Sequence, residues 1–185
     1  MANNPFSLQS ILNNAVKADR QEKLKTSPQL TLGELILKLE TMDGELPVYF
    51  DNKKYRPTSI GSWRGSYDEL SINYKGSDEV NSDKLEEEID MGKYGKEYIY
   101  EPFDTTLPKD VKVKHLLQML KSIIGKTMTG YKGGNFLIGK STPLWVSKYG
   151  GSKGYRTNKN YDSQAIVDVE KKEEKAILKT KFISY

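Results

Sequence analysis

The chain has 185 residues, a hydrophobic fraction of 36%, a charged fraction of 29% and a formal net charge of +4, which suits one soluble domain. The absence of cysteine excludes a disulfide scaffold, a thiolate metal site and a cysteine nucleophile, and the single histidine, His115, excludes a multi-histidine metal cage. No apolar run approaches the ~20 residues that cross a bilayer and no signal-peptide pattern is present, so we expect an intracellular protein.

The first expected element is a helical N-terminal arm, residues 1–28. Apolar side chains at helical spacing run from Leu8 to Val16, and Ser7 is a suitable N-cap. The polar continuation ends at Ser27-Pro28. Because this stripe is too short to form a core, we expect the arm, over Phe6–Leu24, to pack on the body or on another subunit and to support a homo-oligomer, most simply a dimer.

Residues 29–185 are expected to form a single α+β domain. Its first helix follows Thr31, because Thr31-Leu-Gly-Glu34 has the form of a capping box. The apolar residues after this cap lie at spacing 0, 3, 4 and 7 on one helix face: Leu32, Leu35, Ile36 and Leu39. Three strands are expected next, at 46–50, 59–63 and 70–74.

The middle of the chain, residues 76–108, is an acidic and turn-rich excursion. Between Gly76 and Asp104 there are ten acids and three bases. The aromatic run at 98–103 is typical either of an edge strand or of a docked loop.

The second half begins with another expected helix, over 112–124, ended by Gly125. His115 has no acid near it in sequence, which is typical of an ordinary helix residue. Strands are expected at 128–138 and 144–147, and a final hairpin at 165–169 and 176–183 that turns at 171–174. We therefore predict an antiparallel sheet of about six strands, with two helices packed on one face.

A faint repeat accompanies these elements. The helix of 32–39 precedes Pro47-Val-Tyr-Phe50, and the helix of 113–120 precedes Pro143-Leu-Trp-Val146. Two explanations remain open, an internal duplication and the generic spacing of amphipathic helices.

Charge is distributed unevenly along the chain. Residues 111–161 contain ten bases and no acid. This pattern favours a positive surface that attracts an anion, or else a solvated lysine-rich face neutralised by the acidic segment nearby.

A phosphate-loop pattern occurs at Gly134-Asn-Phe-Leu-Ile-Gly139-Lys140-Ser141. Its middle residues are apolar and typical of a strand, and Thr142-Pro143 precedes another strand instead of the helix that would hold a phosphate. A hairpin turn at Gly139-Lys140 is the better interpretation.

Two segments remain as candidates for an anion site, residues 62–68 and residues 125–134. Glycines allow backbone amides to approach an anion, lysines and arginine supply charge, and aromatic rings allow stacking. Each segment can equally be a plain hairpin. The expected ligand-binding residues are Trp63, Arg64, Tyr67, Lys126, Thr129, Tyr131, Lys132, Gly133 and Gly134, with no metal site and no cofactor.

The order of these segments resembles a family of small, mostly uncharacterised tailed-bacteriophage proteins. The resemblance covers about Thr31 to Val169, and its specific parts are Trp63-Arg-Gly-Ser-Tyr67 and Thr129-Gly-Tyr-Lys-Gly-Gly134. The acidic excursion departs from the family's compact pattern. The resemblance implies a phage origin and a place of action in the host cytoplasm, without implying a mechanism.

We therefore expect a non-enzymatic phage accessory protein that binds an anionic nucleotide-type ligand or nucleic acid, for example a host-defence antagonist that sequesters a nucleotide signal. One alternative is a protein–protein inhibitor of a host nucleic-acid-processing or defence enzyme, which would use the acidic segment as a nucleic-acid mimic. A second is a small nucleotide-acting enzyme.

Overall fold

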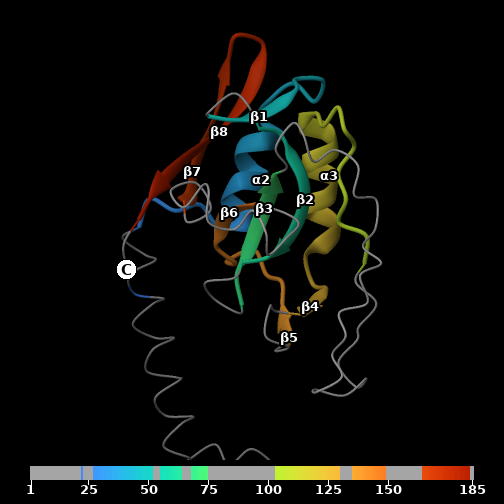
Figure 1. Cartoon of the computed structure of the whole chain (residues 1–185), viewed down its shortest axis with the longest axis vertical. Coiled ribbons are helices and arrows are strands. Elements are labelled where there is room, and N and C mark those ends of the chain that lie inside the picture. The colour runs from blue at the N-terminus through green and yellow to red at the C-terminus, as the bar shows by residue number, and fades with distance from the viewer. Residues whose placement is uncertain are drawn as a thin grey trace, which may run out of the picture.

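The computed structural model describes residues 22, 27–51, 55–63, 68–74, 103–129, 135–148 and 164–183 (Figure 1). The predicted arm before Ser27, apart from residue 22, lies outside the described residues, as does the acidic excursion of 76–108 except for residues 103–108. The helices are α2 (Leu32–Glu40) and α3 (Val113–Ile123). The strands are β1 (Val48–Phe50), β2 (Pro57–Ser62), β3 (Leu70–Tyr74), β4 (Thr127–Thr129), β5 (Asn135–Leu137), β6 (Leu144–Lys148), β7 (Gln164–Lys172) and β8 (Lys175–Phe182).

Six strands form one mixed sheet in the order β1-β8-β7-β6-β3-β2, and β4 and β5 form a separate two-stranded sheet. The α+β class, the six-stranded sheet and the two helices are confirmed. The antiparallel sheet is wrong, because β1 pairs with β8 in parallel and β3 pairs with β6 in parallel. Each parallel pair joins strands from different halves of the chain, and neither half's hydrophobic pattern specifies such a pairing.

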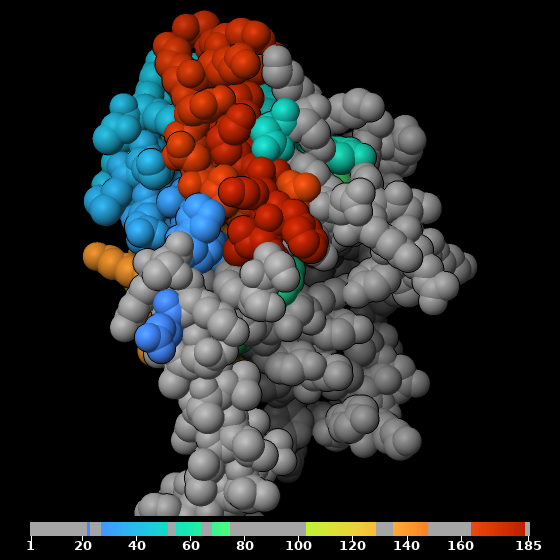
Figure 2. All heavy atoms as spheres, turned by 90° about the vertical axis from the view of Figure 1, so that its left-hand side faces the viewer, coloured from blue at the N-terminus to red at the C-terminus, as the bar shows by residue number. Residues whose placement is uncertain are grey.

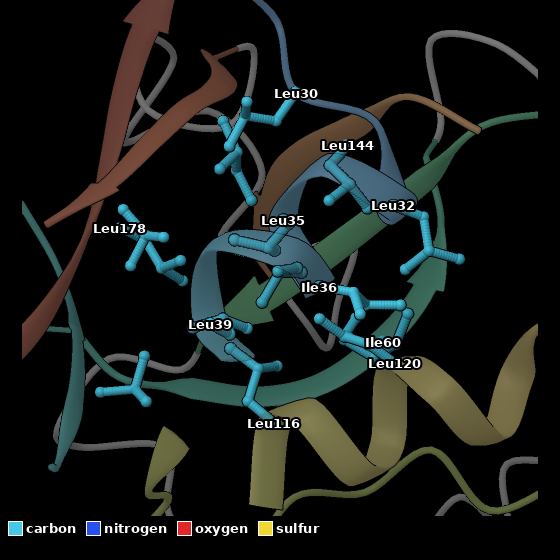
Figure 3. Packing of buried hydrophobic residues seen from close by; sticks show 14 of the residues in the cluster. Leu30, Leu32, Leu35, Ile36, Leu39, Ile60, Leu116, Leu120, Leu144 and Leu178 are labelled. Atoms are coloured by element: carbon cyan, nitrogen blue, oxygen red, sulfur yellow. The ribbon is translucent and has the colours of Figure 1, made fainter. Parts of the chain in front are cut away.

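The core lies between the sheet and the two helices. Side chains from both helices and from the strands turn toward this common interior (Figure 3). The predicted helix face at spacing 0, 3, 4 and 7 is buried in α2, and in α3 the same face is buried except at Leu117, which is half-buried. The apolar periodicity therefore locates the core correctly.

In each helix, the side chain of the third helical residue accepts a hydrogen bond from the backbone amide of the N-cap residue. The Thr31 amide donates to Glu34 Oε2 at 2.7 Å, as the capping box predicts. In α3 the Lys112 amide donates to His115 Nδ1 at 3.1 Å. His115 thus has a capping role that the sequence interpretation missed, because an imidazole is not part of the usual capping pattern.

The turns at the ends of these elements have the expected backbone. Gly125 follows α3 with a φ of +80°, a conformation that favours glycine. The β7–β8 hairpin turns at Glu173 and Glu174, whose φ values of 49° and 55° fit a two-residue turn with the right-handed twist of the strands. Figure 2 shows this hairpin (red) beside α2 (blue), and Lys38 of α2 pairs with Asp168 of β7 at 2.9 Å.

The two halves of the chain repeat one arrangement, which supports the duplication. Each half has a helix and then three strands of the six-stranded sheet, α2-β1-β2-β3 and α3-β6-β7-β8, and the second half also carries β4 and β5 between α3 and β6. In both halves the last two strands form an antiparallel hairpin with a register shift near its start, and the first strand pairs in parallel with the last strand of the other half. The sheet therefore consists of two matching groups, β1-β8-β7 and β6-β3-β2.

Hydrogen bonds at the helix starts repeat in the same way. The Leu32 amide donates to the Thr142 carbonyl at 2.8 Å, and the Val113 amide donates to the Leu46 carbonyl at 2.9 Å. Each helix therefore begins against the segment that leads into the other half's first strand. This exchange joins the two halves into one body.

Candidate functional site

The two halves differ in the length of their connections. The α3–β6 connection has 20 residues (124–143), whereas the α2–β1 connection has seven (41–47). The β2–β3 connection has seven residues (63–69), whereas the equivalent β7–β8 connection has two. The β6–β7 connection has 15 residues (149–163), whereas the equivalent β1–β2 connection has six. Since the shorter versions already complete the repeated fold, the extra residues are the natural place for function.

All of the predicted ligand-binding residues fall in two of these longer connections. Trp63 and Lys126 are described with their side chains, and Thr129 by its backbone at the end of β4. The other six lie outside the described residues: Arg64, Tyr67, Tyr131, Lys132, Gly133 and Gly134.

These two connections end side by side. The first leads into β3 at Leu70 and the second leads into β6 at Leu144, and these two residues are partners in the parallel β3–β6 pair. The Leu70 amide donates to the Pro143 carbonyl at 3.2 Å. In Figure 1 the start of β3 and the β4–β5 hairpin both lie toward the lower end of the described body. The fold thus brings the ends of the two candidate segments to one end of the sheet.

A tryptophan pair lies at the base of the first connection. The Trp63 ring stacks on Trp145 at 3.8 Å between centroids with an interplanar angle of 4°. Trp145 is 2% exposed, and its Nε1–H donates to Glu69 Oε2 at 2.5 Å. The Trp63 amide donates to the Glu69 carbonyl at 2.8 Å, which closes the loop. One face of the Trp63 ring is therefore covered by Trp145. The sequence analysis did not identify Glu69 or Trp145 as partners of this loop.

Next to this pair, the sheet carries a buried polar layer. The Asn73 side chain donates to Ser59 Oγ at 3.0 Å and accepts from Ser71 Oγ at 2.7 Å. All three residues are buried. They alternate along their strands with core residues such as Ile72, so they lie on the sheet face opposite the leucine core. The alternation Leu-Ser-Ile-Asn in β3 was the signal that could have identified this layer.

Lys126 begins the β4–β5 hairpin, and its ammonium lies 4.7 Å from the centre of the Phe103 ring. Its backbone is fixed from two sides, since its amide donates to the Ile123 carbonyl at 3.0 Å and its carbonyl accepts from the Ile138 amide at 2.9 Å. The hairpin is therefore anchored to the end of α3.

The β4–β5 hairpin has two unlike faces. Met128 pairs with Phe136, and both pack against the core. Thr127 pairs with Leu137 on the other face, where both are exposed, Leu137 to 68%. The described outer face of this hairpin is therefore free of acids.

The phosphate-loop pattern has no phosphate-binding geometry. The residues 140–142 do lie at a helix start, that of α2, but its first amides are already occupied. The Leu32 amide donates to the Thr142 carbonyl and the Gly33 amide to the Lys140 carbonyl, both at 2.8 Å. The predicted hairpin turn is also wrong, because β5 pairs with β4 whereas β6 pairs with β3 and β7. The segment is a turn between two different sheets.

Several lysines of the acid-free run pair with acids from the first half. Glu45 accepts from Lys112 at 2.6 Å and also from Lys114, and these two hydrogen bonds lower the pKa of Glu45 to about 2. Glu40 pairs with Lys121 at 2.6 Å. Within the part of the chain that the structure describes, Lys126 and Lys140 have no acidic partner. These two are lysines of the acid-free run, and both lie in the connection 124–143.

The described residues show neither a metal-ligand cluster nor a membrane-spanning helix. They contain no group of three or more His, Asp or Glu side chains placed to hold a metal ion, and neither α2 nor α3 is long and apolar enough to cross a membrane. Comparisons of the whole chain with protein families, with characterised proteins and with solved structures give no match.

Proposed function

We propose that the protein is a non-enzymatic binding protein for an anionic ligand of the nucleotide type, held as a small molecule or as part of a nucleic acid. The proposed site is the end of the sheet where the connections 63–69 and 124–143 meet. One observation carries this proposal: two of the three longer connections end side by side there, and the longer of them, 124–143, contains Lys126 and Lys140, which have no acidic partner among the described residues.

Each part of a nucleotide has a suitable partner in these two connections. Lys126 and Lys132 supply positive charge, and Arg64 supplies a planar fork that can bind phosphate through two hydrogen bonds. Tyr67 and Tyr131 supply aromatic faces on which a base can stack. The amides of the Gly-Gly pair at 133–134 can approach an anion closely.

The biological setting rests on the resemblance to tailed-bacteriophage proteins. We propose that the protein acts in the host cytoplasm as a phage accessory factor. Sequestering a nucleotide signal of the host defence is the form of this function that a small, non-enzymatic binder suits best.

The test is direct identification of the ligand. Mass spectrometry of small molecules released by denaturing the protein, purified from infected cells, is expected to detect a nucleotide. Titration with that nucleotide, or with single-stranded DNA if none is released, should then show affinity that falls as salt rises. If the purified protein retains no phosphate-containing molecule and does not bind DNA, the proposal is contradicted.

Variants locate the site. Arg64→Ala and Lys132→Ala should each weaken binding by roughly 5- to 150-fold, the equivalent of about 1–3 kcal/mol for a charge-assisted hydrogen bond. Lys172→Ala is the matched control, because Lys172 is an exposed lysine at the end of β7, outside both connections. Equal affinity in all three variants would exclude this site.

A further inference from the structure

An open, mostly apolar groove of about 510 Å³ runs beside α2. Its walls come from α2, from the end of α3 and from the turn before β6, and include Gly33, Leu37, Ile124 and Lys140. Leu37 is 65% exposed although it is a large apolar residue in the middle of a helix. Together with Ile36 and Ile124, which also line the groove, this side chain offers a partner an apolar surface.

The second half of the chain provides an internal control for this surface. The Gly33 amide donates to the Lys140 carbonyl at 2.8 Å, and in the other half the Lys114 amide donates to the Gly44 carbonyl at 3.0 Å. Gly33 and Lys114 are thus equivalent. Four residues further along each helix, Leu37 is equivalent to Gln118, which is also exposed.

The equivalent surface of α3 is polar. Besides Gln118, it carries Lys112 and Lys114, and both of these lysines pair with Glu45. The groove beside α2 also contains an ion pair, between Glu40 and Lys121 at 2.6 Å, so the two surfaces differ chiefly at Leu37 against Gln118. The fold does not require an apolar side chain at this helix position, so a bound partner is the better explanation of Leu37.

The chain itself contains a segment of matching chemistry. Residues 1–16 have no charged side chain, and Leu8, Ile11, Leu12 and Ala15 have the spacing 0, 3, 4 and 7 with which a helix binds in a groove. The ten residues 17–26 join this segment to the described body and span about 15 Å as the helix expected for the arm, or up to about 33 Å when extended, and α2, with nine residues, is about 14 Å long. The segment can therefore reach a groove on a neighbouring molecule.

We propose that the groove binds residues 8–16 of a second copy and that two copies exchange these segments. Leu30 is held by hydrogen bonds with Ile166 and Leu144, so the chain departs between β7 and β6 and would have to reverse over Thr31 to enter its own groove. Exchange between two copies avoids this reversal and fills both grooves with one two-fold contact. The proposal does not depend on the ligand proposed above, although Ile124 and Lys140 of the groove belong to the connection 124–143.

The first test measures the mass of the full chain in solution by light scattering and sedimentation over a range of concentrations. We expect a dimer. Leu37→Gln, which introduces the residue that α3 has, and Leu12→Gln should each raise the dissociation constant of the dimer at least tenfold. Both variants should keep the far-ultraviolet circular dichroism spectrum, because Leu37 is exposed. Gln118→Ala is the control and should remain dimeric.

The second test identifies the occupant of the groove. Because the chain has no cysteine, single cysteines can be introduced without background. Mixing Leu37→Cys with Leu12→Cys should give a disulfide between copies on a non-reducing gel. A double variant that forms only an internal disulfide would show that each segment occupies its own groove, which would overturn the exchange. A monomeric full chain, or a dimer unchanged by Leu37→Gln and Leu12→Gln, would overturn it as well.

Discussion

Trp145→Phe should destabilise the protein far more than Trp63→Phe, although both substitutions alter the same stacked pair. Phenylalanine at 145 keeps a ring beneath Trp63 but removes the Nε1–H donor that bonds to Glu69 at 2.5 Å. Glu69 is 3% exposed, so water does not replace the lost donor.

The expected magnitude follows from three properties of the site. Removing one hydrogen bond from a buried carboxyl group costs about 1–3 kcal/mol. Trp145 is 2% exposed, so the smaller ring leaves a cavity that costs about 1 kcal/mol more. Trp63 is only half-buried, and Trp63→Phe keeps the Trp145–Glu69 bond, so its loss should be about 1 kcal/mol, the value of a reduced aromatic contact.

The assay is urea unfolding followed by far-ultraviolet circular dichroism, because both substitutions alter tryptophan fluorescence. The wild type and the two variants are compared at the same protein concentration. We expect a loss of about 2–4 kcal/mol for Trp145→Phe. A loss below about 1 kcal/mol for Trp145→Phe, or an equal loss in Trp63→Phe, would refute the view that the Trp145–Glu69 bond holds the base of the loop.

Three further predictions concern the repeated framework. Gly33→Ala should lower the free energy of unfolding by about 1–3 kcal/mol, because the new Cβ would lie 3.1 Å from the Lys140 carbonyl oxygen. In Gly139→Ala the nearest contact of the new Cβ is a serine hydroxyl at 3.8 Å, so this variant should lose less than half as much stability when both are measured by urea unfolding. His115→Ala should cost about 0.5–2 kcal/mol through the lost cap, and a variant as stable as the wild type would contradict that role. The pKa of Glu45 is lowered from 4.5 to about 2, so its stabilising effect is present above pH 4.5 and lost as pH falls toward 2; Glu45→Gln should flatten this part of a profile of melting temperature against pH.

Local signals in the sequence predicted the elements well. The capping box at Thr31, the apolar spacing in both helices and Gly125 after α3 each depend on residues within one or two turns of one another. Such signals act through short-range geometry, so a single sequence reveals them.

Pairing between distant segments was not predictable in this way. Val48 pairs with Ala176, and Leu70 pairs with Leu144, over separations that no local pattern encodes. The same limit explains why these ion pairs were not predicted, since Glu45 of the first half neutralises Lys112 and Lys114, which lie in an acid-free run of the sequence. It also explains the missed partner of Trp63, because Trp145 comes from another strand.

The exchange of first strands between the halves has a consequence for how the chain acquires its structure during synthesis. Among the described strands, the edge strand β1 hydrogen-bonds in the sheet only with β8, which follows it by more than 120 residues in the chain. Val48 and Phe50, both fully buried in the finished protein, would remain without their strand partner until β8 has been synthesised. Contacts this distant in sequence make folding slow, and the waiting apolar strand favours association with other chains. The nascent N-terminal half should therefore bind chaperones until β8 is released.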